Sequence, residues 1–462
     1  MDASPSPKTF LGQPAGLAYL AFTEAWERFS YYGMSALLVL YMSEQLLLPG
    51  NVERVAGFGA FRGAIEAVTG PQSVRGLASI IYGLYAAMIH FSPLFGGLLA
   101  DRVLGARRTV MLGAGLLCFG HFAMAMDGSF LLALLLLVLG CGCVKGNIAA
   151  QVGSLYDPAD APRRTRAFVI FNVGINVGAT GGPLLCGLLA QVWGWHAGFA
   201  MAGVLMLAGL ATYIAGQRYL PPEPGRGARQ RAAVAGAAPE PLDRRLIGLL
   251  ILVIAVTVFQ SIAYYQTGSV GQIWIHDAVN LSTPLGPFPI AWFHSVDSLF
   301  SVLGVAPLLA LWAWQARRGG EPDDLAKIAI GAGLAAASST LLVVAAMLAA
   351  RHGSVSFLWP FAARAGMGIA FLYYWPTILA LVTRKAPARV EGVMLGVVFA
   401  SLFVSNLTMG WLGSFYDRMG AVDFWELNTG VAVVGLMLAL GLGRALRGRA
   451  VWADARPAAS LA

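Results

Sequence analysis

The chain contains a series of apolar segments that are each long enough to cross a lipid bilayer. A membrane-spanning helix needs roughly 20 mostly apolar residues, because the hydrocarbon core is about 30 Å thick. Only 12% of the 462 residues are charged and 58% are hydrophobic, which is more apolar surface than a water-soluble core can bury. We therefore predict an all-α membrane protein with twelve spans, near residues 14–43, 76–100, 108–126, 130–152, 166–190, 196–219, 246–272, 289–315, 325–350, 354–383, 390–414 and 426–446.

Positively charged residues are unequally divided between the two sides of these spans. With the N-terminus inside, the arginine-rich loops near 102–108, 163–166, 226–245 and 384–389 and the C-terminus all lie in the cytoplasm. This asymmetry follows the positive-inside rule, so we expect both termini in the cytoplasm. The compact loops favour a bacterial inner membrane. The net charge of +8 then reflects topology, and we expect no nucleic-acid partner.

A segment rich in proline, glycine, alanine and arginine separates the sixth and seventh spans. Such a composition is typical of a flexible linker. We predict an N-terminal six-helix half over residues 1–220, a cytoplasmic linker over 221–245, a C-terminal six-helix half over 246–446 and a cytoplasmic tail over 447–462. Six spans plus six spans is the arrangement of the major facilitator fold, in which two halves rock about a site near the midplane of the membrane.

Three charges interrupt the first apolar segment. Glu24, Glu27, Arg28 and Tyr31 are spaced at i, i+3, i+4 and i+7, so they share one helical face. A charged residue at mid-membrane costs about 2.5–3.5 kcal/mol, so this face is expected to point into the bundle or a wet cavity. An arginine between two acids can exchange partners when a proton arrives. A static cluster of buried ion pairs is the alternative.

The loop after the second span has a characteristic composition. Gly96 and Gly97 are followed by Asp101, Arg102, Arg107 and Arg108, a pattern that resembles the loop between helices two and three of the major facilitator superfamily. The acid and the arginines could form a gating charge lock at the cytoplasmic mouth, and we group Arg364 of span ten with them as a predicted gating residue. An ordinary positively charged loop is the alternative.

Four stretches resemble one transporter family in order and spacing. Residues 24–33 match the E-x-x-E-R-F-x-Y-Y-G signature of the proton-dependent oligopeptide transporter (POT) family. Residues 140–147, 171–178 and 291–300 resemble its fourth-, fifth- and eighth-helix motifs, with Asn172 in place of a tyrosine. The resemblance implies proton-coupled import of di- and tripeptides or peptide-like compounds by alternating access.

The resemblance also implies roles for individual residues. It assigns proton coupling to Glu24, Glu27, Arg28 and Lys145. It assigns substrate contacts to Tyr31, Tyr32, Tyr85, Asn147 and Asn176, although each tyrosine could instead serve only in packing.

Departures from the family pattern concentrate in the substrate site. Ser35 stands where the family has a second arginine, and Tyr265 and Phe371 stand where it has acids in helices seven and ten. Val398 corresponds to a helix-eleven tryptophan. With the charged clamp lost, the aromatic residues Tyr265, Phe371 and Trp375 favour a more apolar, flatter or capped substrate.

New charges appear in the C-terminal half. Asp297 in span eight and Arg364 in span ten lie at similar depth, so we hypothesise that they pair and partly replace the clamp. The alternative is that the two residues do not pair and that one of the charges reaches water in an outer vestibule. His294, one turn before Asp297, is interpreted as a hydrogen-bonding group of the pocket rather than a proton relay.

Other functions remain open at this point. The cargo could be a modified amino acid, a peptide natural product or another small anion, or the chain could be a sensor that binds ligand without transport. A drug exporter is a further alternative, and the direction of substrate flux under a proton gradient would distinguish it from an importer. We find no nucleophile–base set or metal cluster and read the four cysteines as packing residues, so we expect no enzyme activity, cofactor or metal. We expect a monomer in the lipid bilayer.

Overall fold

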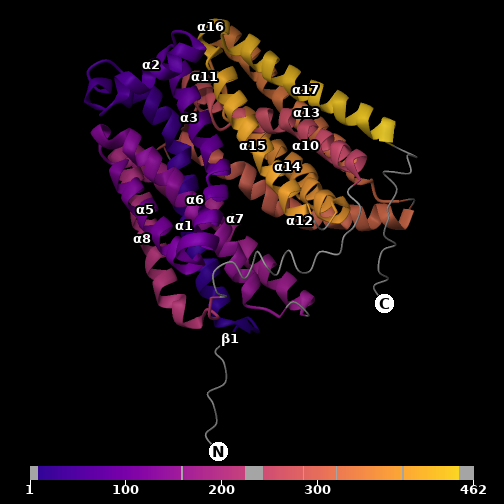
Figure 1. Ribbon diagram of the computed structural model, residues 1–462. Helices are drawn as coiled ribbons and strands as arrows, with labels where there is room; N and C mark the ends of the chain where they lie inside the picture. The colour runs from indigo at the N-terminus through magenta and orange to yellow at the C-terminus, as the bar shows by residue number, and fades with distance from the viewer. Residues whose placement is uncertain are drawn as a thin grey trace, which may run out of the picture.

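The computed structural model describes residues 9–157, 160–223, 243–284, 286–318, 320–387 and 390–446. Within these ranges the chain forms twelve long helical segments, which follow the predicted spans to within about two turns (Figure 1). Ten of these segments have the length and hydropathy of a membrane span. The other two are α1, which contains Glu24, Glu27 and Arg28, and α5, which begins with two arginines. The predicted all-α membrane fold is therefore confirmed.

Six of the long segments form the N-terminal half. They are α1 (Ala15–Tyr41), α3 (Val74–Phe91) continued by α4 (Pro93–Leu99), α5 (Ala106–Ala123), α6 (Phe130–Ser154), α7 (Ala161–Trp193) and α8 (Trp195–Gly216). Short helical turns at Met42–Leu46, Val52–Arg54, Ala100–Leu104, Asp127–Ser129 and Gln217–Tyr219, with the helix α2 (Phe58–Thr69), complete this half.

The other six form the C-terminal half. They are α10 (Arg244–Gln266) continued by α11 (Val270–Ala278), α12 (Phe293–Arg318) after a turn at Ile290–Trp292, α13 (Asp324–His352), α14 (Leu358–Lys385), α15 (Glu391–Gly413) followed by α16 (Tyr416–Met419), and α17 (Ala421–Leu446). The predicted linker and tail lie largely outside the described residues, and the domain boundaries stay predictions.

In the described part of the chain, strands are limited to three pairs of two-residue strands, all outside the helices. β1 (Thr9–Phe10) pairs antiparallel with β2 (Gln13–Pro14), β3 (Val279–Asn280) pairs parallel with β6 (Val355–Ser356), and β4 (Ser282–Thr283) pairs antiparallel with β5 (Gly286–Pro287).

Local chemistry explains where several helices begin. The carboxylates of Asp243 and Asp323 accept hydrogen bonds from the first backbone N–H groups of α10 and α13. Along the helices, large apolar side chains such as Phe119, Leu132 and Met437 are more than half exposed. In a chain of this composition such a surface faces lipid, because lipid tails solvate apolar groups and helices satisfy their own backbone.

The two halves meet mainly on one side of the bundle. We call the side where α1 begins the terminal side and the opposite side, which carries α2, α11 and α16 at the top of Figure 1, the far side. Near the far side α3 crosses α15 so closely that a Cβ on Gly83 would lie 2.6 Å from the carbonyl oxygen of Asn406. At the start of α12, Ser295 Oγ donates to the Thr180 carbonyl of α7 over 2.6 Å. Toward the terminal side, Leu94 and Phe95 on α4 are exposed.

Candidate functional site

The charged stripe of α1 is buried at the centre of the N-terminal half. Glu24, Glu27 and Arg28 are 3%, 1% and 4% exposed. Arg28 Nε lies 2.5 Å from Glu27 Oε2 and 3.2 Å from Glu24 Oε1, so one guanidinium bridges both carboxylates. Removing either partner from a buried ion pair leaves an uncompensated charge, which is strongly unfavourable. The stripe therefore holds one cation between two acids, as its spacing predicts.

Two glycines of α7 allow this close packing around α1. A Cβ on Gly178 would lie 2.5 Å from the Ala25 carbonyl oxygen, and one on Gly182 would lie 2.3 Å from that of Phe29. Glycines four residues apart let two membrane helices approach along one face. The fifth-helix motif, which ends at Gly178, therefore positions α1 as well as contributing to the pocket.

Lys145 faces the same region from α6. Its side chain is half-buried and lies within electrostatic range of Glu24, Glu27 and Arg28. It forms no ion pair with any described residue. Lys145 is therefore a cation near the stripe that is not neutralised by a direct partner.

A second buried ionic network lies in the C-terminal half. Arg364 Nη1 of α14 is 3.6 Å from Asp297 Oδ1 of α12, and the two side chains are 4% and 8% exposed. The Tyr264 hydroxyl of α10 donates to the other carboxylate oxygen, Asp297 Oδ2. The pairing hypothesised from matching depth is present, and it includes a tyrosine that the sequence did not reveal.

Arg364 has further partners just after α10 and at the start of α11. Its Nη1 donates to Thr267 Oγ1 over 3.1 Å. The Gln272 amide oxygen, in the orientation that its neighbours require, accepts from Arg364 Nη2 and from His294 Nε2, each over 3.2 Å. His294 Nε2 also lies 3.2 Å from the Gly268 carbonyl, so this nitrogen carries a hydrogen. His294 is thus a hydrogen-bonding group here, as interpreted from sequence.

Aromatic rings pack against one another within each half and across the interface between the halves. In the C-terminal half the Phe371 ring lies 5.5 Å from Tyr264 and stacks on Trp375 at 6.1 Å. Tyr265 packs edge-on against His90 of α3 at 6.2 Å, and so connects the halves. On α1, Tyr31 and Tyr32 pack edge-on at 5.0 Å. These rings are half-buried, so each keeps surface for other contacts. The sequence analysis did not predict roles for His90 and Tyr264, because each contacts a residue of another helix: His90 packs on Tyr265, and Tyr264 donates to Asp297.

Four other predicted substrate contacts lie on helices of the N-terminal half. Tyr85 and Ser35 are 4% and 5% exposed. Asn147 is 4% exposed, and its amide nitrogen donates to the Cys143 and Gly96 carbonyls over 2.9 and 3.3 Å. Asn176 is half-buried and donates to the carbonyl of Asn172 one turn earlier over 2.9 Å. Their roles toward substrate stay predictions.

The expected charge lock after the second span is not formed in this structure. Asp101, Arg102 and Arg108 are exposed, and Asp101 makes no ion pair with a described residue. Arg107 instead donates through Nη2 to the carbonyls of Leu220 and Pro221 over 2.7 and 2.5 Å. Arg107 therefore connects the start of α5 to the segment after α8. Arg364, grouped with these residues as a gating group, belongs to the C-terminal network.

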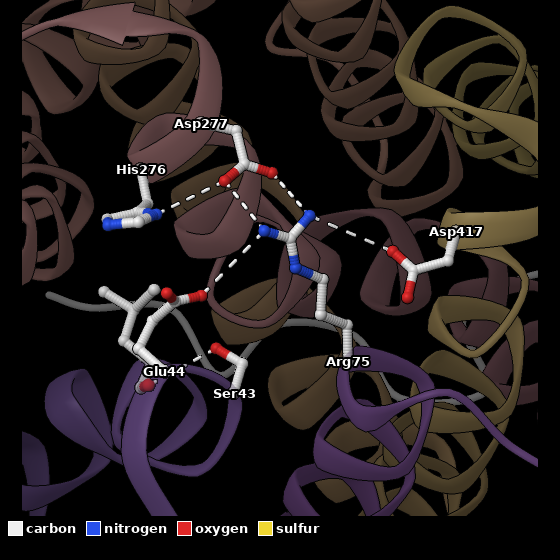
Figure 2. Close-up of polar contacts among 7 residues, drawn as sticks. Ser43, Glu44, Arg75, His276, Asp277 and Asp417 are labelled. Atoms are coloured by element: carbon white, nitrogen blue, oxygen red, sulfur yellow. Dashed lines mark hydrogen bonds and ion pairs between the residues drawn. The ribbon is translucent and has the colours of Figure 1, made fainter. Parts of the chain in front are cut away.

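A cluster of charges joins the halves on the far side, and sequence reasoning gave it no role (Figure 2). Arg75 at the start of α3 makes a two-pronged contact with Asp277 of α11, at 2.7 and 3.0 Å. It lies 3.9 Å from both Asp417 of α16 and Glu44 after α1. The only available signal was that arginines are scarce on this side. We call these four residues the far-side cluster.

Comparison with known proteins places this fold and site in a family. The family model of the Major Facilitator Superfamily matches residues 27–409. A peptide transporter of Yersinia enterocolitica, YePEPT, is 30% identical over 89% of each chain. A di-/tripeptide transporter of Lactococcus lactis is 28% identical over 93% of this chain and 95% of its own.

Solved structures of POT transporters have the same fold as this protein. A peptide transporter POT in complex with sulfate superposes with a TM-score of 0.78 at 26% identity, over 95% of each chain. A POT family transporter in complex with 5-aminolevulinic acid has the same TM-score at 22% identity, over 95% of this chain and 98% of its own, and so shows the shared fold. The expected arrangement of two six-helix halves is confirmed. The chain belongs to the proton-dependent oligopeptide transporter family of the Major Facilitator Superfamily.

Proposed function

We propose that this protein is a proton-coupled symporter that imports di- and tripeptides or peptide-like compounds by alternating access. The observation that carries the proposal is the buried stripe of α1, in which Arg28 is shared between Glu24 and Glu27. Family membership and the relatives named as peptide transporters support the same reading. The proposal assigns the chain no catalytic reaction.

The geometry of the shared arginine supports proton coupling. A proton on Glu24 or Glu27 removes one of the two negative charges that neutralise Arg28. The stripe then carries one more positive charge in a region of low dielectric, where charge interactions act over longer distances. That change favours the arrival of an anionic group and alters the electrostatic interaction with Lys145. Proton binding and substrate binding therefore become linked.

The contacts between the halves support alternating access. On the far side, the close approach at Gly83, the hydrogen bond from Ser295 of α12 to Thr180 of α7 and the far-side cluster hold the halves together. We propose that this is the state closed on the far side, and that Arg75 releases Asp277 when the halves rock.

We further propose a monomer in a bacterial inner membrane, with the terminal side in the cytoplasm. The distribution of arginines supports this orientation. In that orientation substrate and proton enter from the far side and leave on the terminal side. Reporter fusions at each terminus test the orientation, since an active cytoplasmic reporter at both ends is expected.

Proton influx into liposomes tests the proposed symport. Purified protein is reconstituted with a pH dye inside, and an inside-negative potential is imposed before substrate is added. We expect substrate-dependent acidification that is lost in Glu24→Gln and Glu27→Gln. Glu66→Gln on the exposed helix α2 is the matched control and is expected to behave like the wild type. Equal proton influx in all three variants would contradict the proposed role of the stripe.

A further inference from the structure

The buried carboxylates of this protein are already engaged by its own side chains. Among the described residues, three carboxylates are buried: Glu24, Glu27 and Asp297. The first two share Arg28. Asp297 contacts Arg364 and accepts a hydrogen bond from Tyr264. The pocket region therefore offers a substrate no buried acid that lacks a cation.

This shortage has a direct consequence for a free amino terminus. An ammonium group that leaves water is strongly disfavoured unless it gains a charge-assisted hydrogen bond. Asp297 Oδ1 has no hydrogen-bond partner, but to receive the ammonium Asp297 would have to exchange its ion pair with Arg364 or divide one negative charge between two cations. Thr267 and Gln272 also hold Arg364 in place. A substrate without an ammonium group avoids this exchange.

The cations are balanced differently. Arg28 and Arg364 are both engaged with carboxylates, whereas Lys145 forms no ion pair with a described residue. Three buried carboxylates then face three cations, and a proton on the α1 stripe leaves one positive charge in excess. The site is therefore suited to a single anionic group, such as a carboxylate.

The aromatic residues fit the remainder of such a substrate. Tyr264, Phe371 and Trp375 form an aromatic row in the C-terminal half, in which Phe371 stacks on Trp375 and is tilted against Tyr264. Tyr265 packs edge-on against His90 of the other half. Apolar and aromatic groups gain from contact with such rings. A body with apolar side chains and a neutral amide in place of the amine matches this surface.

We propose that the substrates of this transporter are N-capped peptides or N-acyl amino acids, with one carboxylate, no free ammonium and an apolar body. The inference rests on the proposed function and specifies its substrate class. Lys145 receives the carboxylate, and the aromatic row receives the capped, apolar end.

Binding and transport of a matched pair of dipeptides test the proposal. Alanyl-phenylalanine and its N-acetyl derivative differ only at the amino group. Affinity for purified protein is measured by calorimetry, and proton influx is measured in liposomes. We expect the N-acetyl compound to bind at least about tenfold more tightly and to drive the larger influx. Tighter binding of the free dipeptide, or no binding of either, would overturn the substrate class.

The two readouts separate this inference from the proposed function. If the N-acetyl compound binds tightly and no proton moves, the substrate class stands and symport fails. If the free dipeptide drives proton influx and the N-acetyl compound does not, symport stands and the substrate class fails.

Variants of the two ends of the site test the assigned contacts. Lys145→Gln is expected to weaken binding of the N-acetyl dipeptide about tenfold or more, and Lys145→Arg is expected to restore part of it. Phe371→Glu places an unpaired acid in the aromatic row, so this variant is expected to bind the free dipeptide. Phe371→Gln has the same size without the charge and is not expected to bind it. Melting temperatures in detergent identify a variant that fails to fold. Unchanged affinity in folded Lys145→Gln, or no gain in folded Phe371→Glu, would argue against the assigned contacts.

Discussion

The crossing of α3 and α15 gives a quantitative prediction about what holds the far side closed. In Gly83→Ala the new Cβ would start 2.6 Å from the Asn406 carbonyl oxygen and 2.6 Å from the Gly410 Cα. Ordinary contacts of a Cβ are about 3.4–4 Å, so the helices must separate by at least about 0.8 Å. Overpacking of this kind costs about 1–3 kcal/mol. The state closed on the far side should therefore lose population about 5- to 150-fold relative to the other state.

By the same reasoning, the packing contact at Gly83 contributes more free energy to the closed state than the far-side cluster does. The Arg75 and Asp277 side chains are 32% and 29% exposed, so solvent screens their attraction. Such surface pairs contribute about 0.2–1 kcal/mol, at most roughly a fivefold change in population. The gain in helix propensity on replacing glycine by alanine applies to both states and cancels. We therefore expect Gly83→Ala to open the far side more than Arg75→Gln does.

Distance measurements between spin labels check this ranking. Labels at Val68 on α2 and Asp423 at the start of α17 report on far-side separation, because both residues are exposed there. Gly83→Ala should add a population at longer distance and change the transport rate. Gly115→Ala on α5 is the matched control, since a Cβ there meets no atom within 4 Å. If Gly83→Ala gives the same distances as Gly115→Ala, the contact does not restrain the far side.

Three further perturbations have defined outcomes. Arg75→Gln should open the far side modestly at low salt and match the wild type at 1 M salt, because the Debye length there falls to about 3 Å. The same spin labels measure the opening, and a difference that does not change with salt would contradict the prediction. Asp297→Arg and Arg364→Asp should each abolish transport and the double exchange should recover part of it, whereas a double variant as inactive as the singles would remove support for direct pairing. Gly96→Ala should destabilise the N-terminal half by about 1–3 kcal/mol, because its Cβ would collide with the Gly142 carbonyl oxygen of α6. Thermal melts in detergent measure the loss, and Gly97→Ala is the control, since a Cβ there meets no atom within 4 Å.

The sequence predicts features whose cause is local. The α1 stripe is one example, since residues four apart on a helix must share a face and Glu24 can reach Arg28 without any knowledge of the fold. The twelve spans are another, because each depends only on its own apolar length. The Asp297–Arg364 contact could be hypothesised from depth, since an unpaired charge in lipid is costly.

Contacts that depend on how helices cross could not be predicted in this way. Arg75 and Asp277 are separated by 202 residues, and nothing near either one indicates the other. Gly83 is one glycine among 56 in the chain, and only the crossing of α3 and α15 gives it importance. The partners of Arg107 were unpredictable for a related reason, since it donates to the backbone carbonyls of Leu220 and Pro221, 113 and 114 residues away in sequence; the gating role of the charge lock stays a prediction.

The two ionic networks differ in a way that divides the work between the halves. Arg364 is held by groups from other segments, Asp297 on α12, Thr267 just after α10 and Gln272 at the start of α11, so no single proton frees it. Arg28 has both carboxylates on its own helix, and one proton changes its balance of charge without moving another helix. A proton therefore acts most directly on the N-terminal half, while the C-terminal half keeps a fixed, neutralised ionic core behind an aromatic surface. We infer that coupling resides in the first half and that the second selects substrates by shape and by the absence of an ammonium group.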